Sequence, residues 1–162
     1  FLTKNAAEGL NYGAEISLDS EISDTVNMFL NLGILKTEIR KYQSRPDLEG
    51  REQAHAPDYS FSTGLSWEIS NNLEILLDVT GKSDFYYSDS HDNRSNDYLL
   101  TNMNLIFEKD NINLNFWVRN IFDQYYSLRG FYFGNEPPNF EDTLYERHGD
   151  PRNYGVSFRY DF

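Results

Sequence analysis

The residues best suited to bind a ligand gather in one segment near the end of the chain. The candidates within residues 128–152 are one arginine, one amide and four aromatic residues: Arg129, Phe131, Tyr132, Phe133, Asn135 and Tyr145. Aromatic rings beside an arginine suit an anionic ligand that is itself rich in aromatic rings, such as a catecholate complex, because stacking and cation attraction act together. An equally weighted alternative is that residues 131–133 only prolong a hairpin.

A second candidate chemistry is metal binding by histidine and carboxylate. One histidine lies among four acids near the end of the chain: His148 with Glu141, Asp142, Glu146 and Asp150. An earlier segment is rich in aspartate: Asp84, Asp89, Asp92 and Asp97. Hard cations prefer oxygen ligands. However, His55, His91 and His148 fall in three different segments without the spacing of a metal site. Solvated loop residues are the favoured interpretation, and we expect no metal and no cofactor.

Sequence signals of catalysis and of nucleic-acid binding are absent. The chain has no phosphate-binding loop, no nucleophile elbow and no paired zinc-ligand spacing. Its 162 residues include no cysteine, which excludes disulfides and thiolate metal sites. A formal net charge of -12 argues against nucleic acid, whose binding proteins carry basic patches. We therefore expect a protein that is not an enzyme.

The elements that must hold these residues are β-strands. At the end of the chain five apolar residues occupy alternate positions: Tyr154, Val156, Phe158, Tyr160 and Phe162. The same period of two runs through six further segments: residues 12–18, 26–39, 59–69, 73–79, 99–107 and 112–118. This period predicts strands whose side chains point alternately to opposite faces. About seven strands are expected, with at most one helical turn, at residues 140–147.

Short and long connections alternate between these strands. Polar turns are expected around residues 23–24, 71–72 and 109–111, and long loops at residues 41–58, 82–97 and 128–152. Outer-membrane barrels have short turns on one side, long loops on the other, and aromatic girdles near the strand ends. The pattern predicts an all-β, antiparallel, up-and-down transmembrane β-barrel with lipid outside and a hydrated lumen. The alternative is a soluble all-β domain with aromatic packing.

Four segments resemble, in chain order, the TonB-dependent receptors of outer membranes. NIFDQYY at residues 120–126 resembles the family segment that closes the penultimate strand. GDPRNYG at residues 149–155 resembles the entry to its final strand. Upstream, NAAEGLNYGAE at residues 5–15 and GREQAHAP at residues 50–57 resemble its N-x-x-x-A-x-x-x-G-x-E and x-x-N-A-P stretches. The likeness therefore extends along the whole chain.

The resemblance implies a fold and a function together. The family fold is a 22-stranded barrel with a plugged lumen, of which residues 1–162 would be about seven C-terminal strands, without the plug. It implies an outer-membrane receptor and transporter of a Gram-negative bacterium. Such a receptor takes up a scarce large ligand, in the first place a ferric siderophore or similar iron complex, with TonB-coupled energy. The alternatives are a passive porin-like channel and a soluble all-β carbohydrate-binding module.

The resemblance also implies partners. These are outer-membrane lipid, the N-terminal plug and remaining barrel strands of the same receptor, the TonB complex through an N-terminal region, and the barrel assembly machinery. Phe158, Tyr160 and Phe162 resemble the signal that this machinery reads, although Ser157 stands where the family often has glycine. Because the chain begins with Phe1 and shows no signal peptide, we expect a fragment or a processed piece.

Two arginines test the assignment of the faces. Arg119 and Arg159 occupy polar positions of their strands. An arginine facing lipid at the bilayer midplane would cost about 2–4 kcal/mol, so both are expected to point into the lumen. Their partners would be lumen carboxylates or the plug of the receptor, and the sequence leaves that choice open.

Overall fold

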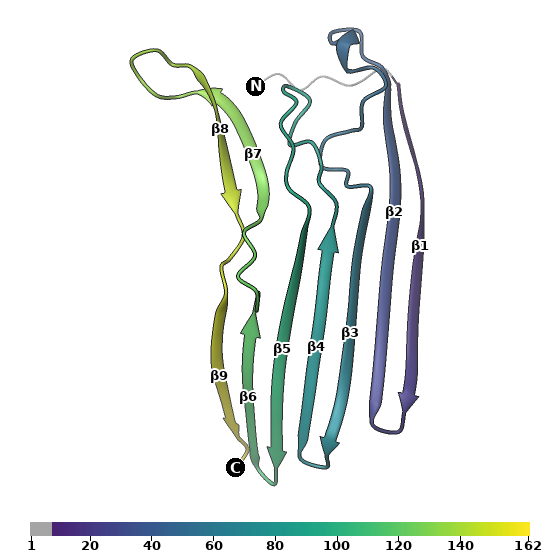
Figure 1. Cartoon of the computed structure of the whole chain (residues 1–162), viewed down its shortest axis with the longest axis vertical. Helices are drawn as coiled ribbons and strands as arrows, with labels where there is room; N and C mark the ends of the chain where they lie inside the picture. The colour runs from purple at the N-terminus through teal and green to yellow at the C-terminus, as the bar shows by residue number, and fades with distance from the viewer. Residues whose placement is uncertain (1–7) are drawn as a thin grey trace.

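Seven strands form one antiparallel sheet in the computed structural model, which describes residues 8–162 (Figure 1). The strands lie in the order β1-β2-β3-β4-β5-β6-β9. Their bounds are β1 Glu8–Ser23, β2 Val26–Lys41, β3 Tyr59–Ser70, β4 Leu73–Lys82, β5 Tyr98–Lys109, β6 Ile112–Arg119 and β9 Asn153–Tyr160. Every neighbouring pair is antiparallel. The expected all-β, up-and-down arrangement is confirmed.

Turns and loops gather at opposite ends of this sheet. Two-residue turns at residues 24–25, 71–72 and 110–111 join the hairpins at one end. The long connections after β2, β4 and β6 all lie at the other end (Figure 1). Asp110 adopts a φ of 51°, a left-handed conformation that aspartate tolerates better than most residues and that closes its turn. The alternation of short and long connections predicted from the sequence is therefore confirmed.

The register of the sheet gathers apolar side chains on one face. Leu65 of β3 lies opposite Met28 of β2 and Leu77 of β4, whereas the next residue, Ser66, lies opposite Asn27. Consecutive side chains of a strand point to opposite faces, so these pairings separate an apolar face from a more polar one. The predicted period of two thus becomes two chemically distinct surfaces of one sheet.

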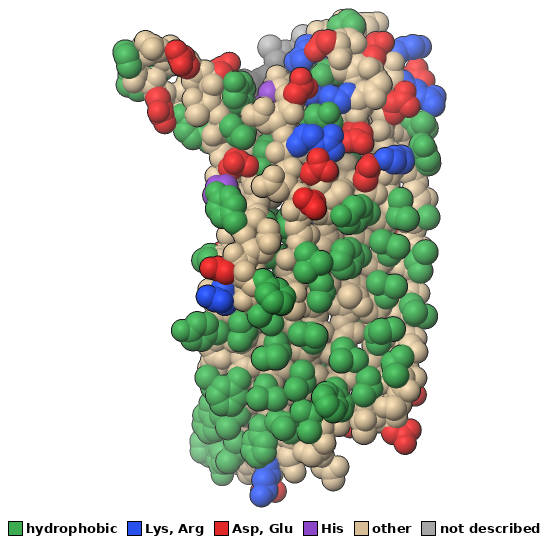
Figure 2. Space-filling model, in the orientation of Figure 1, with side chains coloured by type: hydrophobic (Ala, Val, Ile, Leu, Met, Phe, Trp, Pro, Cys, Tyr) green, Lys and Arg blue, Asp and Glu red, His purple; other side chains and the backbone are tan. Residues whose placement is uncertain are grey.

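The apolar face has no covering layer among residues 8–162. Ile16, Phe116 and Phe158 are 55%, 47% and 64% exposed. Figure 2 shows hydrophobic side chains spread over the sheet and charged side chains gathered mainly at the loop end. The buried hydrophobic side chains lie toward that loop end: Ile39, Leu48, Phe85 and Tyr87. A soluble sandwich would bury such a face against a second sheet, and no other sheet within the described residues packs on this one.

The polar face also carries large apolar rings. Phe29 lies across Gly64 of the neighbouring strand, and Trp117 lies across Gly155. At either glycine a Cβ would overlap the ring, so glycine is required for the ring to lie flat against the backbone. Period-two reasoning assigned polar residues to this face and did not anticipate Phe29.

Both arginines assigned to the polar face lie there. Arg119 pairs with Asp78 of β4 at 3.9 Å, and Asn102 donates a hydrogen bond to the same carboxylate at 2.7 Å. Arg159 stands opposite Asn113 and pairs with Asp161 at 3.3 Å. Of the two partners left open by the sequence, carboxylates of the chain itself are the ones in contact.

The one helical turn that the sequence allows, at residues 140–147, does not form. Asp142–His148 forms strand β8, which pairs with β7 (Ser127–Gly134) in a separate two-stranded sheet. Phe140 has a φ of 52°, which a right-handed helix does not allow. Pairing with β7 gives the backbone hydrogen bonds that one isolated turn would leave to water. Within residues 8–162 the helical structure is one 3₁₀ turn, Pro46–Leu48, and no helix is long and apolar enough to cross a bilayer.

The segment NIFDQYY folds into a turn that fastens the base of the last loop. Asn120, with a φ of 51°, accepts a hydrogen bond from the Gln124 amide at 2.8 Å and donates one to the Asp150 carbonyl oxygen at 3.2 Å. Asp123 accepts a hydrogen bond from the Arg152 amide at 2.7 Å. Two segments that carry the family resemblance, far apart in sequence, are therefore in direct contact.

The two upstream segments of the resemblance lie in different elements. Residues 8–15 of the first belong to β1, whereas residues 5–7 lie outside the described residues. Residues 50–57 belong to the long loop after β2. Gly50 has a φ of 86° there, a conformation that residues with a side chain rarely adopt. The backbone conformation of this loop therefore depends on glycine at position 50.

Candidate functional site

The long loops form a small packed unit, here called the loop head: residues 42–58, 83–97 and 120–152. Phe85 and Tyr87 of the second loop are buried, and their rings meet edge to face at 5.9 Å. The ring of His55, from the first loop, lies 5.4 Å from that of Phe85. Lys82, at the end of β4, holds its ammonium 4.4 Å from the same ring. The first two loops therefore share one small core.

Tyr87 docks the β7–β8 hairpin onto this core. Its ring lies against Gly130 of β7, where any side chain would overlap it, and its hydroxyl donates a hydrogen bond to Glu146 of β8. Burial, and then the Glu146 carboxylate, raise the pKa of Tyr87 to about 12. The hydroxyl therefore keeps its proton at physiological pH and remains the donor that joins the second loop to the third.

A pocket of ≈ 380 Å³ lies between the second loop and β7. All three loops line it: His55 from the first, Tyr87, Ser88, Ser90 and His91 from the second, and Arg129, Gly130, Phe131, Tyr132 and Phe133 from the third. The rings of His91 and Tyr132 lie 5.3 Å apart. Ligand pockets occupy roughly 300–1,000 Å³, so this pocket suits one aromatic group of a large ligand rather than the whole of it.

The structure brings four of the six predicted binding residues into this pocket. They are Arg129, Phe131, Tyr132 and Phe133. Tyr145 stands opposite Phe131 on β8 and stacks on Phe133 at 5.0 Å, so it supports the pocket from the neighbouring strand. Asn135 lies beyond the end of β7 and does not line the pocket. The two interpretations of residues 131–133 are compatible, because the same residues extend a hairpin and line the pocket.

Sequence reasoning missed the other six lining residues, among them three with rings: His55, Tyr87 and His91. It treated both histidines as solvated residues of separate loops. Burial lowers the pKa of both imidazoles; the charge of Arg129 lowers that of His55 further, and the charge of Arg51 that of His91. Both are therefore neutral near pH 7 and can donate and accept hydrogen bonds. The run of three aromatic residues at positions 85–87, in an otherwise polar loop, was the available signal.

Two arginines of the hairpin face each other across its strands. The register places Arg129 of β7 opposite Arg147 of β8. Both are exposed, and neither forms an ion pair with another described residue. Like charges directly opposite each other destabilise a strand pair. An anion between or beside them would relieve this repulsion, so the hairpin favours a negatively charged group in an otherwise acidic chain.

Several of the residues considered for metal binding have other partners. In the second loop Asp84 pairs with Arg94 at 2.6 Å, and Asp92 pairs with Arg51 at 2.6 Å. In the third loop His148 bonds to the Tyr125 hydroxyl at 2.6 Å. Within residues 8–162 no group of three or more histidines and acids is arranged to hold a metal ion. The loop acids thus serve mainly as partners of arginine and tyrosine.

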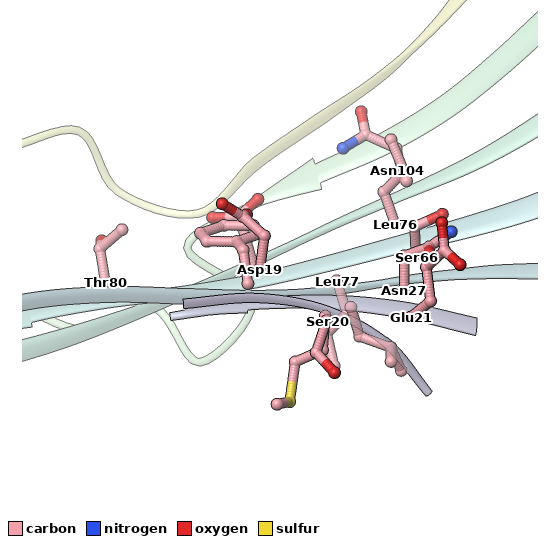
Figure 3. Close-up of a pocket in the computed structure, with 13 residues that line it drawn as sticks. Asp19, Ser20, Glu21, Asn27, Ser66, Leu76, Leu77, Thr80 and Asn104 are labelled. Atoms are coloured by element: carbon pink, nitrogen blue, oxygen red, sulfur yellow. The ribbon is translucent and has the colours of Figure 1, made fainter. Parts of the chain in front are cut away.

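A larger pocket, of ≈ 980 Å³, lies against the sheet and is lined by residues of β1 to β5 (Figure 3). Figure 3 shows Asp19, Thr80 and Asn104 projecting from one side of the sheet and Ser20 from the other. Its carboxylates, amides, hydroxyls and apolar groups do not converge on one point, and it contains none of the predicted binding residues. Its lining residues come from both faces of the sheet, so we regard the loop-head pocket as the candidate site.

Comparisons with known proteins agree on the fold. No family model matches the sequence. The ferric yersiniabactin uptake receptor FyuA of Yersinia pestis superimposes with a TM-score of 0.79 at 18% identity, over 95% of this chain and 24% of its own. The siderophore receptor PiuA of Acinetobacter baumannii superimposes with a TM-score of 0.78 at 14% identity, over 94% of this chain and 22% of its own. The copper transporter OprC superimposes with a TM-score of 0.66 at 14% identity, over 95% of this chain and 24% of its own.

The likeness defines a class of fold. The chain spans about a fifth to a quarter of the length of the solved structures it resembles, and the agreement extends over almost all of its own length. Its fold is therefore that of a segment of a TonB-dependent receptor barrel.

Proposed function

We propose that residues 1–162 are the C-terminal segment of the barrel of a TonB-dependent outer-membrane receptor of a Gram-negative bacterium. The receptor would take up a scarce large ligand, in the first place a ferric siderophore or similar iron complex. The observation that carries the proposal is the loop-head pocket, which Arg129 and aromatic residues line. It lies at one end of a sheet whose apolar face is left uncovered by residues 8–162. The plug would belong to another part of the receptor.

Membrane placement rests on the two faces of the sheet. A bilayer core offers no water to backbone N–H and C=O groups, so strands cross it only in closed sheets. The apolar face would meet hydrocarbon and the polar face a hydrated lumen. Within the described residues β1 and β9 are the edges of the sheet and do not pair with each other. The remaining strands of the receptor would close the barrel, with β9 pairing to its first strand.

The assembly machinery would read the end of the chain. Phe158 and Tyr160 alternate along β9 and are exposed on the apolar face, opposite Leu114 and Ile112. Phe162 follows two residues later, and its ring lies 5.1 Å from that of Tyr160. The three side chains form one accessible apolar row at the free edge of the sheet, which suits recognition by another protein before the barrel closes. The TonB complex would act on the N-terminal region of the receptor.

Pocket chemistry favours an anionic, aromatic iron complex. Stacking on Phe131 or Tyr132 and attraction to Arg129 and Arg147 would both act on a ferric catecholate, which carries rings and negative charge. Structures with this fold differ in what they carry: FyuA is a ferric yersiniabactin uptake receptor, and OprC is a copper transporter. The fold alone therefore does not determine the ligand, which the loops would select.

The test is growth and binding. A strain lacking the receptor should lose growth on one ferric catecholate as sole iron source while keeping growth on ferrous iron. The purified full-length receptor should bind that complex, and Arg129→Gln should weaken binding about tenfold, or about 1.4 kcal/mol. Lys109→Gln, in the turn at the opposite end of the sheet, is the matched control and should bind normally. Normal growth on every iron source, with loss on a glycan instead, would reject the iron ligand.

Two other functions have their own tests. A passive porin-like channel would have a signal peptide that leads directly into strands, without a plug domain, in the complete sequence. A soluble carbohydrate-binding module would give a folded monomer without detergent. Exposed apolar residues on the sheet argue against the second, because such a face is an aggregation hazard in water.

A further inference from the structure

An arginine of the first loop is enclosed by the second loop. The side chain of Arg51 is only 10% exposed. Its guanidinium donates hydrogen bonds to the carbonyl oxygens of Ser88 at 2.8 Å and His91 at 3.2 Å, and pairs with Asp92 at 2.6 Å. The Asp89 carboxylate lies 3.6 Å away. Exposed ion pairs contribute little to stability, whereas a cation enclosed by several partners fixes the backbone that surrounds it.

A second arginine contacts the same part of the loop. The guanidinium carbons of Arg51 and Arg94 lie 4.4 and 4.2 Å from the ring centre of Tyr86. Arg94 also pairs with Asp84 of its own loop at 2.6 Å and with Glu52 of the first loop at 3.1 Å. Two ion pairs therefore join the first loop to the second: Arg51 with Asp92, and Glu52 with Arg94.

The backbone that Arg51 holds is one wall of the candidate pocket. Ser88, Ser90 and His91 line the pocket, and the carbonyl groups bound by Arg51 belong to the first and last of these three. We propose that Arg51 is a positioning residue of this pocket, which holds residues 88–91 in the shape that sets His91 against Tyr132. The expected effect on ligand binding rests on the proposed function. The positioning of residues 88–91 rests only on the contacts of Arg51.

The chemistry requires arginine at this position. The planar guanidinium presents five donors in a fixed fork, so one side chain reaches two carbonyl oxygens and a carboxylate together. A lysine ammonium is a compact point charge, which would keep the pairing with Asp92 but lose at least one carbonyl contact. Arg51→Lys therefore separates the geometric role of the fork from its charge. The matched control is Arg40→Lys, because Arg40, at the end of β2, makes one exposed ion pair with Glu8.

The experiment uses the full-length receptor in detergent micelles. Hydrogen exchange over residues 86–94 should rise about tenfold in Arg51→Lys, while exchange in β3 to β6 stays unchanged. Binding of ferric tris(2,3-dihydroxybenzoate) should weaken about tenfold with the number of sites per molecule unchanged, because a misplaced wall lowers affinity without unfolding the site. Arg40→Lys should alter neither measurement.

Each outcome decides the role of Arg51. Wild-type exchange over residues 86–94 in Arg51→Lys would overturn the proposal. Raised exchange with unchanged affinity would also overturn it, since the loop would then be stabilised without any effect on the pocket. If the wild-type receptor fails to bind this probe, the proposed ligand class falls. In that case the chemical shift of the His91 imidazole, compared between wild type and Arg51→Lys, decides whether the pocket wall has moved.

Discussion

The sheet and the loop head are held together in opposite ways. The seven-stranded sheet buries almost no side chains and is held by backbone pairing from β1 to β9. The loop head is held by side chains: Phe85 and Tyr87 are buried, and Arg51 is enclosed by carbonyl groups and a carboxylate. A sheet that faces lipid needs no core of its own, because the bilayer covers its apolar surface. Loops that extend into water need a hydrophobic core of their own.

The largest effect should follow from removing the side chain that joins the loops. Tyr87→Ala leaves a cavity beside Gly130 and Phe85 and removes the hydrogen bond to Glu146. Loss of a buried aromatic costs about 3–5 kcal/mol, here local to the loop head. Limited proteolysis of the full-length receptor should cut residues 127–148 much faster, while the barrel strands stay protected. Equal loss of protection in the strands would show that the two regions are one cooperative unit.

A charge on the apolar face should impair the sheet and leave the loop head alone. Phe158→Arg places a cation in lipid at about 2–4 kcal/mol, whereas Ser157→Arg, one residue earlier, faces the lumen. The amount of folded receptor in the outer membrane should fall strongly for the first and little for the second. Heat-modifiable mobility on gels measures the folded fraction. Similar yields for the two variants would reject the assigned faces.

Acid should loosen the loop head but not the sheet, where there is no histidine. The pKa values of His55 and His91 are lowered from 6.5 by burial, so the loosened loops bind more protons than the packed ones below that pH. Stability of the packed state is complete above pH 6.5 and falls as the pH drops further, toward the lowered values. Hydrogen exchange of residues 85–91, corrected for intrinsic rate, should rise between pH 7 and 5. Replacing both histidines with glutamine should remove the rise.

The smallest effect should distinguish binding from stability within the hairpin. Arg147→Gln removes a like charge opposite Arg129, so the thermal stability of the unliganded receptor should stay the same or rise by a few tenths of a kcal/mol. Binding of an anionic iron complex should weaken in the same variant. A loss of stability together with unchanged binding would mean that Arg147 supports the hairpin and contributes nothing to the site.

The same contrast explains what the sequence could predict. Period two identified the strands because the apolar and polar faces of the sheet are encoded residue by residue, and the polar turns marked the ends of the strands. The loop head depends on contacts between distant residues, such as Arg51 with Ser88 and Tyr87 with Glu146, which no local pattern records. Strand β8 was missed for this reason, since its partner β7 decides its conformation. Arg129, which lines the pocket, could be proposed from the sequence because the charge of an arginine is evident without its neighbours.

The most direct test of the account is the environment of alternate residues along β9. This segment has no cysteine, so single cysteines can be introduced at positions 154 to 158 of the full-length receptor and labelled with a nitroxide in a lipid bilayer. We expect collision with oxygen, which concentrates in lipid, to be high at positions 154, 156 and 158, and collision with a water-soluble nickel complex to be high at 155 and 157. Equal accessibility to both reagents at all five positions would contradict the membrane-facing sheet on which the receptor assignment depends.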